Sequence, residues 1–103
     1  MLYHVHVWGE NYKLRLLKTE YCDNGTLAVI AVTDIGEAFC DVTRNIDTPG
    51  AAANQAFVDV NNCPWMPEFL EKNGIATPTG VMGQSGFCLY PLYKFDLSKL
   101  EEL

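Results

Sequence analysis

The sequence predicts an α+β fold: a mainly antiparallel sheet of about five or six strands, with one packed helix and a short C-terminal helix. Three observations lead to this prediction. Short alternating apolar stretches, separated by turn residues, fill residues 2–43. A segment starting near residue 64 has proline at its beginning and glycine at its end, which is typical of a helix. The 103 residues, 49% of them hydrophobic, suit a single domain spanning 1–103.

Residues 2–43 are expected to form a four-stranded antiparallel meander. The expected strands are Leu2–Trp8, Tyr12–Leu17, Thr26–Thr33 and Ala38–Thr43. The first two alternate in hydrophobicity around a short link that contains Gly9, which predicts a hairpin. The third is apolar on both faces, as in a central strand covered on both sides. Short links favour pairing between strands that follow one another along the chain.

The helix is expected over Pro64–Asn73. Asn62 and its asparagine neighbour precede it and offer N-cap acceptors, and proline is tolerated in a first helical turn. Gly74 suits a left-handed C-cap, and Ile75 can fold back onto the last turn. The segment therefore carries both a start and a stop signal.

The other elements of the second half are less regular. They are a surface connection over 44–54, a strand over Gln55–Val60, a turn over Thr77–Gly80, a flexible loop over Gly83–Gly86, a strand over Phe87–Phe95 and a helix over Leu97–Leu103 that Asp96 caps. Pro91 removes a ladder donor from the Phe87–Phe95 strand, which predicts an edge strand or a bulge there. An exposed edge at that point would leave room for a second copy, so a homodimer stays open.

Charge narrows the classes of partner. Thirteen acidic and seven basic residues give a net charge of −6, which disfavours direct nucleic-acid binding because phosphate backbones are repelled. The one close basic group, Lys13, Arg15 and Lys18, keeps nucleic-acid binding as a third alternative. No apolar window is long enough to span a membrane, and residues 1–13 lack the features of a signal peptide. A cytoplasmic location with free thiols is expected.

The residues that could carry catalysis do not form a convincing set. Ser85 lies in the sequence GQSGF, where Phe87 stands in place of the second glycine of a nucleophile elbow, so no catalytic residue is predicted. His4 and His6 lie on one face of the first expected strand and could share a metal ion. With Cys88 they define the alternative, a metal-binding protein or a small enzyme. No cofactor is predicted.

With no convincing catalytic set, the remaining candidates for function are aromatic residues that could lie on the surface. Tryptophan and tyrosine concentrate in the hot spots of protein interfaces, although they also fill cores. Trp65, Tyr90 and Tyr93 are therefore the predicted binding patch, and Trp8 is a further candidate. The partner would be a protein, whose identity the residues do not reveal.

The stretches AFVDVNNCPWMPEFLEKNGIATPTG and GQSGFCLYPLYKFDL cover about residues 55–97. They resemble a family of small uncharacterised proteins, a domain-of-unknown-function family, from gut Gram-positive bacteria and often from plasmids and conjugative elements. The resemblance implies no activity, cofactor or site residue. It implies an accessory role for mobile DNA, such as blocking host defence. The leading expectation is a non-enzymatic cytoplasmic protein-interaction module with such a role.

Overall fold

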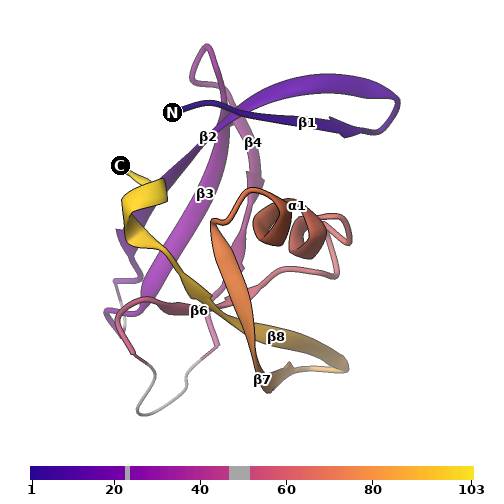
Figure 1. Ribbon diagram of the computed structural model, residues 1–103. Helices are drawn as coiled ribbons and strands as arrows, with labels where there is room; N and C mark the ends of the chain where they lie inside the picture. The colour runs from indigo at the N-terminus through magenta and orange to yellow at the C-terminus, as the bar shows by residue number, and fades with distance from the viewer. Residues whose placement is uncertain (23, 47–51) are drawn as a thin grey trace.

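A computed structural model of the chain describes residues 1–22, 24–46 and 52–103, and in this part the fold consists of two sheets and one α-helix (Figure 1). The first sheet contains β1 (Tyr3–Val7), β2 (Glu10–Glu20), β3 (Leu27–Thr33), β4 (Ala38–Asp41) and β9 (Glu101–Glu102). The second contains β5 (Thr43–Arg44), β6 (Gln55–Val58), β7 (Ala76–Ser85) and β8 (Cys88–Phe95). The helices are α1 (Met66–Lys72) and a 3₁₀ turn, η1 (Leu97–Lys99). The expected α+β class with a mainly antiparallel sheet is confirmed.

The meander predicted for residues 2–43 is confirmed, because β1 to β4 are antiparallel neighbours in chain order. On β2, Leu14 and Leu16 are buried while Lys13 is exposed, as the alternation requires. On β3 both faces are mostly buried, which fits its central position. None of the helices within the described ranges is both long and apolar enough to cross a membrane.

The strand expected over Ala38–Thr43 is divided between the two sheets. Val42 stands at the crossing, fully buried, and its N–H donates to the Val29 carbonyl oxygen (2.9 Å). Thr43 then begins β5, and its Oγ1 accepts from the Val29 N–H (3.0 Å). This break couples the sheets, since one strand serves both. Of the expected surface connection that follows, residues 47–51 lie outside the described part of the chain.

The second sheet has the order β5-β6-β8-β7. The turn expected over Thr77–Gly80 and the loop expected over Gly83–Gly86 are wrong for most of their length. Thr77, Pro78 and Gly83–Ser85 pair with β8 as parts of the long strand β7, and Thr79 and Gly80 lie in the register shift. The reversal comes at Gly86 and the residue after it, between the paired Ser85 and Cys88. Gly86 has a φ of 61°, as the first central position of a type II′ hairpin turn requires.

The strand that contains Pro91 is not the edge strand that one of the two predictions required. β8 is an interior strand that pairs with both β6 and β7. Pro91 stands opposite Met82, where the β7–β8 register shifts, and one residue before Leu92, where pairing with β6 ends. The bulge alternative is therefore correct and the edge alternative is wrong. Proline fits this position because the ladder is already interrupted there.

The start of the helix differs from the prediction. Trp65 is the N-cap residue, no side chain caps the helix, and the first turn contains the expected proline. Asn62 does not cap, because its side-chain amide donates to Asp59 Oδ2 (2.9 Å) and its N–H to Asp59 Oδ1 (3.2 Å). The buried Asp59 carboxylate thus competes for the asparagine and holds the turn that leads into α1.

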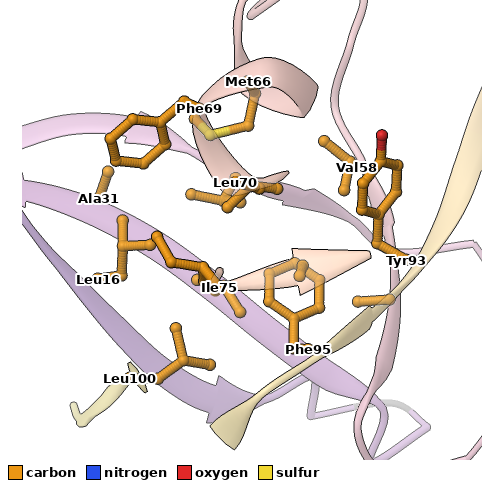
Figure 2. Packing of buried hydrophobic residues seen from close by; sticks show 14 of the residues in the cluster. Leu16, Ala31, Val58, Met66, Phe69, Leu70, Ile75, Tyr93, Phe95 and Leu100 are labelled. Carbon is orange, nitrogen blue, oxygen red and sulfur yellow. The ribbon is translucent and has the colours of Figure 1, made fainter. Parts of the chain in front are cut away.

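The end of the helix is as predicted. Gly74 has a φ of 65°, and the Ile75 N–H donates to the Leu70 carbonyl oxygen (2.9 Å). Ile75 is fully buried against the last turn. Figure 2 shows how α1 then fills the space between the sheets. The labelled cluster contains Met66, Phe69 and Leu70 from the helix, Leu16 and Ala31 from the first sheet, and Val58, Tyr93 and Phe95 from the second.

The C-terminal helix is shorter than expected. Asp96 does cap it, since its carboxylate accepts from the Ser98 N–H (3.0 Å), but η1 ends at Lys99. Glu101–Glu102 instead form β9, which pairs in parallel with β2 at Leu17 and Lys18. β1 pairs with β2 only as far as Leu14, so this edge of β2 is open and accepts the C-terminal residues.

Candidate functional site

The predicted patch of Trp65, Tyr90 and Tyr93 does not form one surface. Tyr90 and Tyr93 are buried, with 2% and 4% of their surface exposed. The Arg44 guanidinium lies 5.4 Å from the centre of the Tyr90 ring. The Tyr93 hydroxyl donates to Glu71 Oε2 (2.8 Å), and burial together with this carboxylate raises its pKa to about 12. Direct contact with a partner requires exposure, which both tyrosines lack, because Tyr93 lies in the main core cluster and Tyr90 packs with Phe57 and Leu92.

Trp65 belongs to a different surface, which we call the aromatic ledge: Trp8, Phe39 and Trp65. Trp8 stacks on Phe39 with ring centroids 5.4 Å apart and an angle of 29° between the rings. The edge of one tryptophan meets the face of the other at 6.0 Å. Phe39 and Trp65 also meet edge to face, at 6.2 Å. Such pairs hold one another in place beyond their burial alone.

Trp8 is the exposed member of the ledge, with 63% of its surface accessible. The strand expected over Leu2–Trp8 ends at Val7, and Trp8 and Gly9 form the two-residue turn of the β1–β2 hairpin. Their φ angles of 53° and 76° correspond to a type I′ turn. A left-handed backbone costs a bulky residue such as Trp8 about 1 to 3 kcal/mol. The alternating pattern predicts a strand at Trp8 and no such strain, although a residue that precedes glycine between two alternating runs is itself a signal for this kind of turn.

A groove of about 200 Å³ runs beside the ledge, between β1 and α1. It is lined by His4, Val5, His6, Val7, Trp65, Glu68, Phe69, Lys72 and Asn73. The Trp65 Nε1–H faces no acceptor among the described residues, although the atom is buried. A buried donor without a partner costs about 1 to 3 kcal/mol. The lining of the groove therefore combines apolar and aromatic side chains with charges of both signs, Glu68 and Lys72.

The two histidines lie where the sequence predicts, exposed on one face of β1. His6 Nδ1 is hydrogen-bonded to Asn11 Oδ1 (2.9 Å). Within the described residues, no group of three or more His, Cys, Asp or Glu side chains could hold a metal ion. The alternative that uses these histidines lacks further ligands in that part of the chain.

Cys88 is not brought to the histidines. It lies on β8 in the second sheet, in hydrogen-bonding contact with the Tyr90 hydroxyl, whereas β1 pairs with β2 in the first sheet. Ser85 closes the β7–β8 hairpin opposite Cys88. Neither Ser85 nor Cys88 has a histidine beside it in the second sheet, so neither is paired with a base that could activate it as a nucleophile.

Two other thiols meet between the first sheet and the turn that precedes α1. Cys40 on β4 and the buried Cys63, just before α1, are in side-chain contact. Burial raises the pKa of both thiols, and for Cys40 the neighbouring sulfur raises it further. Both groups are therefore held as inert thiols. Cys22, in contrast, is exposed.

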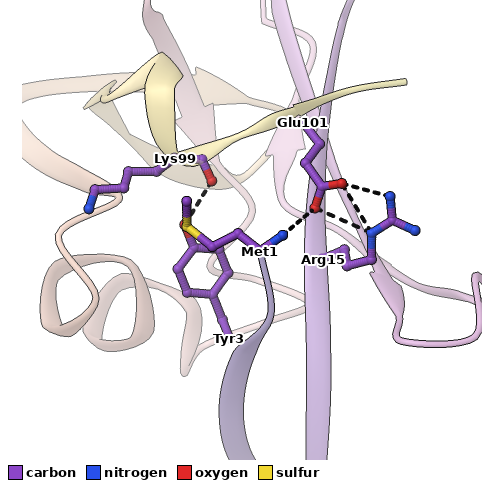
Figure 3. A network of polar contacts seen from close by, with 5 residues as sticks. All are labelled: Met1, Tyr3, Arg15, Lys99 and Glu101. Carbon is purple, nitrogen blue, oxygen red and sulfur yellow. Dashed lines mark hydrogen bonds and ion pairs between the residues drawn. The ribbon is translucent and has the colours of Figure 1, made fainter.

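The basic group on β2 is engaged by the chain's own C-terminal residues. Arg15 Nη2 lies 2.6 Å from Glu101 Oε1, and Lys18 Nζ lies 3.4 Å from Glu102 Oε1. The Met1 amino group also contacts Glu101 (3.2 Å), as Figure 3 shows. β9 thus brings two carboxylates to the basic group, which lowers the positive potential that a phosphate backbone would need.

We expect Glu101 to contribute to stability in a defined pH window. Its bonds to Arg15 and to the Met1 amino group lower its pKa from 4.5 to about 2. A lowered pKa in the folded state stabilises the protein above the unfolded pKa of 4.5, and this gain is lost as the pH falls toward 2. Glu101→Gln should therefore lower the urea midpoint at pH 7. The difference from the native chain should shrink between pH 4.5 and 2, and a difference that is constant with pH would contradict the pairing.

Comparison with known proteins places the chain in a family. Residues 14–103 match the family described as a domain of unknown function, DUF4313. The chain belongs to the DUF4313 family. No curated protein and no solved structure matches it. The DUF4313 match leaves out β1, the Trp8 turn and the first four residues of β2, and it includes Phe39 and Trp65 of the aromatic ledge. The expected membership of a family of uncharacterised proteins is confirmed.

Proposed function

We propose that this DUF4313 chain is a non-enzymatic protein-interaction module that binds a partner protein through the aromatic ledge and the groove beside it. The observation that carries the proposal is Trp8. It is a large apolar side chain, mostly exposed, in a backbone conformation that costs free energy. Asparagine or glycine would be relaxed at this turn position, whereas tryptophan is strained there even though it stacks on Phe39.

The ledge is suited to binding because it is ordered before a partner arrives. Trp8 is held by its stacking on Phe39 and by the edge contact with Trp65, so little rotational freedom remains to be lost. Rigid aromatic side chains next to a pocket are the usual anchors of protein interfaces.

Charge indicates the chemistry of the partner. The chain has a net charge of −6, so its overall field favours a basic partner, although the groove beside the ledge includes both the exposed Glu68 and the exposed Lys72. Glu10 follows the Trp8 turn and accepts from the Tyr12 hydroxyl (2.8 Å). An arginine or lysine of the partner could lie over the Trp8 ring and approach these carboxylates. The proposed partner is therefore a protein with a basic, exposed segment.

The proposal includes a cytoplasmic location and an accessory or anti-defence role for a mobile element. The resemblance of about residues 55–97 to proteins often found on plasmids and conjugative elements supports this part. A stoichiometric binder is consistent with it, because a protein that blocks another needs a contact surface and no chemistry.

The test identifies a binding partner of the native chain and then compares the affinity of that partner for the native chain and for variants of the aromatic ledge. Tagged native chain should retain a partner from host-cell extract that mass spectrometry identifies, and purified partner should then bind in a titration. Trp8→Ala should weaken the titrated affinity at least about tenfold, as expected for a hot spot, and Trp8→Phe should weaken it less. Ile35→Ala is the matched control, since Ile35 is as exposed but lies on the β3–β4 turn.

Equal affinities for the native chain and Trp8→Ala would remove the ledge as the contact surface. A melting temperature for Trp8→Ala near that of the native chain shows that any loss is not due to unfolding. A partner whose binding surface is acidic would overturn the charge argument.

A further inference from the structure

The β7–β8 hairpin carries a second surface, far in sequence from Trp8 and independent of the ledge. Its exposed apolar side chains are Val81, Met82, Phe87 and Leu89. Phe87 is fully exposed at the turn, and the other three have about half of their surface accessible. In Figure 1 the hairpin reaches the end of the molecule opposite β1. Exposed apolar groups gathered on one projecting element mark an interaction site.

β7 also has a free edge. It is the last strand of the second sheet, and among the described residues its one neighbour in that sheet is β8. Ser85 and Cys88 close a two-residue turn, and such a closing pair exchanges both of its hydrogen bonds. Alternation along the ladder then directs the N–H and C=O groups of Gln84 and Met82 outward, away from β8. These groups are a template for one more strand.

The two halves of this edge differ. Pro78 and the register shift that follows it interrupt the first half of the edge. Proline and bulges are usual means by which proteins keep a strand edge from pairing with another chain. The second half, from Met82 to Ser85, carries neither proline nor charge. Its side chains alternate, so Met82 lies on the same face as its cross-strand neighbour Pro91 and as Leu89, the partner of Gln84. An open backbone edge and an apolar face therefore coincide on one short segment.

Charge selects the occupant of this surface. Residues 73–93 contain no Asp, Glu, Lys, Arg or His, although the whole chain has twenty acidic and basic residues and a net charge of −6. Two copies of so acidic a chain repel one another wherever their charged faces meet. A neutral apolar strip is the surface on which they can meet without placing like charges opposite each other. A surface that binds a strongly charged partner would be expected to carry charges of the opposite sign, and this strip carries none.

We propose that the β7–β8 hairpin is a self-association surface, on which two copies of the chain pair β7 with β7 in antiparallel orientation about a twofold axis. Gly83 lies at the axis, and the outward groups of Met82 exchange hydrogen bonds with those of Gln84 in the second copy. Leu89 and Met82 of the two copies pack together beside the new ladder. The paired segment is short, so the dimer is of the weak, reversible class.

Sedimentation equilibrium of the purified full chain, from about 1 µM to about 1 mM, is the first test, since this range covers weak interfaces. The native chain should pass from monomer to dimer and no further. Met82→Lys should raise the dissociation constant at least about tenfold, because it removes an apolar contact and brings two lysines together near the axis. Ile35→Lys is the matched control: it makes the same charge change at an exposed aliphatic residue on another turn.

Hydrogen exchange gives a residue-level readout on the native chain. The Met82 and Gln84 amides should become protected as the concentration rises, whereas the Gly83 and Ser85 amides, already bonded to β8, should not change. A monomer at every concentration would overturn the proposal. Association that Ile35→Lys weakens as much as Met82→Lys, or that leaves the Met82 and Gln84 amides unprotected, would also overturn it. Trp8→Ala should leave the dimer unchanged, so this proposal and the proposed function can fail separately.

Discussion

Replacing Phe95 with alanine should destabilise the protein by about 3 to 5 kcal/mol, a large share of the stability of a domain of this size. The Phe95 side chain is 2% exposed and lies in the main core cluster with Ile75 and Leu100 (Figure 2). Its loss removes the transfer free energy of the ring and leaves a cavity in this cluster. The melting temperature should fall by at least about 12 °C.

The matched control is on the same strand pair. Phe87→Ala makes the same chemical change at a residue that is fully exposed in the β7–β8 turn. Its effect on stability should stay within about 0.5 kcal/mol. Both variants should be unfolded in urea at low protein concentration, where self-association does not contribute. Similar losses at the two positions would show that the core is not placed as described.

Gly83→Val should destabilise the protein by about 1 to 3 kcal/mol, toward the upper end of that range. A Cβ at residue 83 would lie 2.5 Å from Cε1 and 2.8 Å from Cζ of Phe57. Phe57 is buried with Tyr90 and Leu92 and has little room to yield. Gly83 lacks a left-handed backbone, so the cost comes from this contact alone. Replacing glycine also lowers the conformational entropy of the unfolded chain, but this effect offsets only about 0.4 to 1 kcal/mol of the destabilisation.

A double-mutant cycle tests whether Phe57 is the cause. In a Phe57→Leu background the ring is absent, so Gly83→Val should cost at least about 1 kcal/mol less than in the native chain. Gln84→Val is the control, because Gln84 is the next residue on β7 and its side chain is exposed on the opposite face. If the cost of Gly83→Val is the same in both backgrounds, the contact with Phe57 does not explain the glycine.

Much of the local structure could be predicted, because neighbouring residues decide it. The alternation around Leu14 and Leu16 located β2 and its inward face. The apolar run of β3 indicated burial on both sides. Gly74 and Ile75 predicted the end of α1, since a left-handed cap needs only glycine and one apolar residue after it.

The errors concern segments for which the folded chain offers a hydrogen-bonding partner that competes with the local preference. Thr77–Gly80 has the composition of a turn, yet β8 offers it a ladder and it becomes a strand. The chain after Lys99 has helical composition but finds the open edge of β2. The asparagine expected to cap α1 is held by the buried Asp59. In the first two cases a long-range hydrogen-bonding partner outweighs a local preference of less than about 1 kcal/mol per residue. In the third case the competing partner is a carboxylate three residues earlier in the chain.

The candidate site shows the same division. Residue identity and short-range periodicity set the element types of most of the chain, the acidic charge and the neutrality of residues 73–93. Which aromatic side chains reach the surface depends on how the sheets and the helix pack. This packing covers Tyr90 and Tyr93, and it moves Trp8 from a strand into a strained turn beside Phe39 and Trp65. Exposure is a property of how sheets and helix pack, and no local pattern contains it.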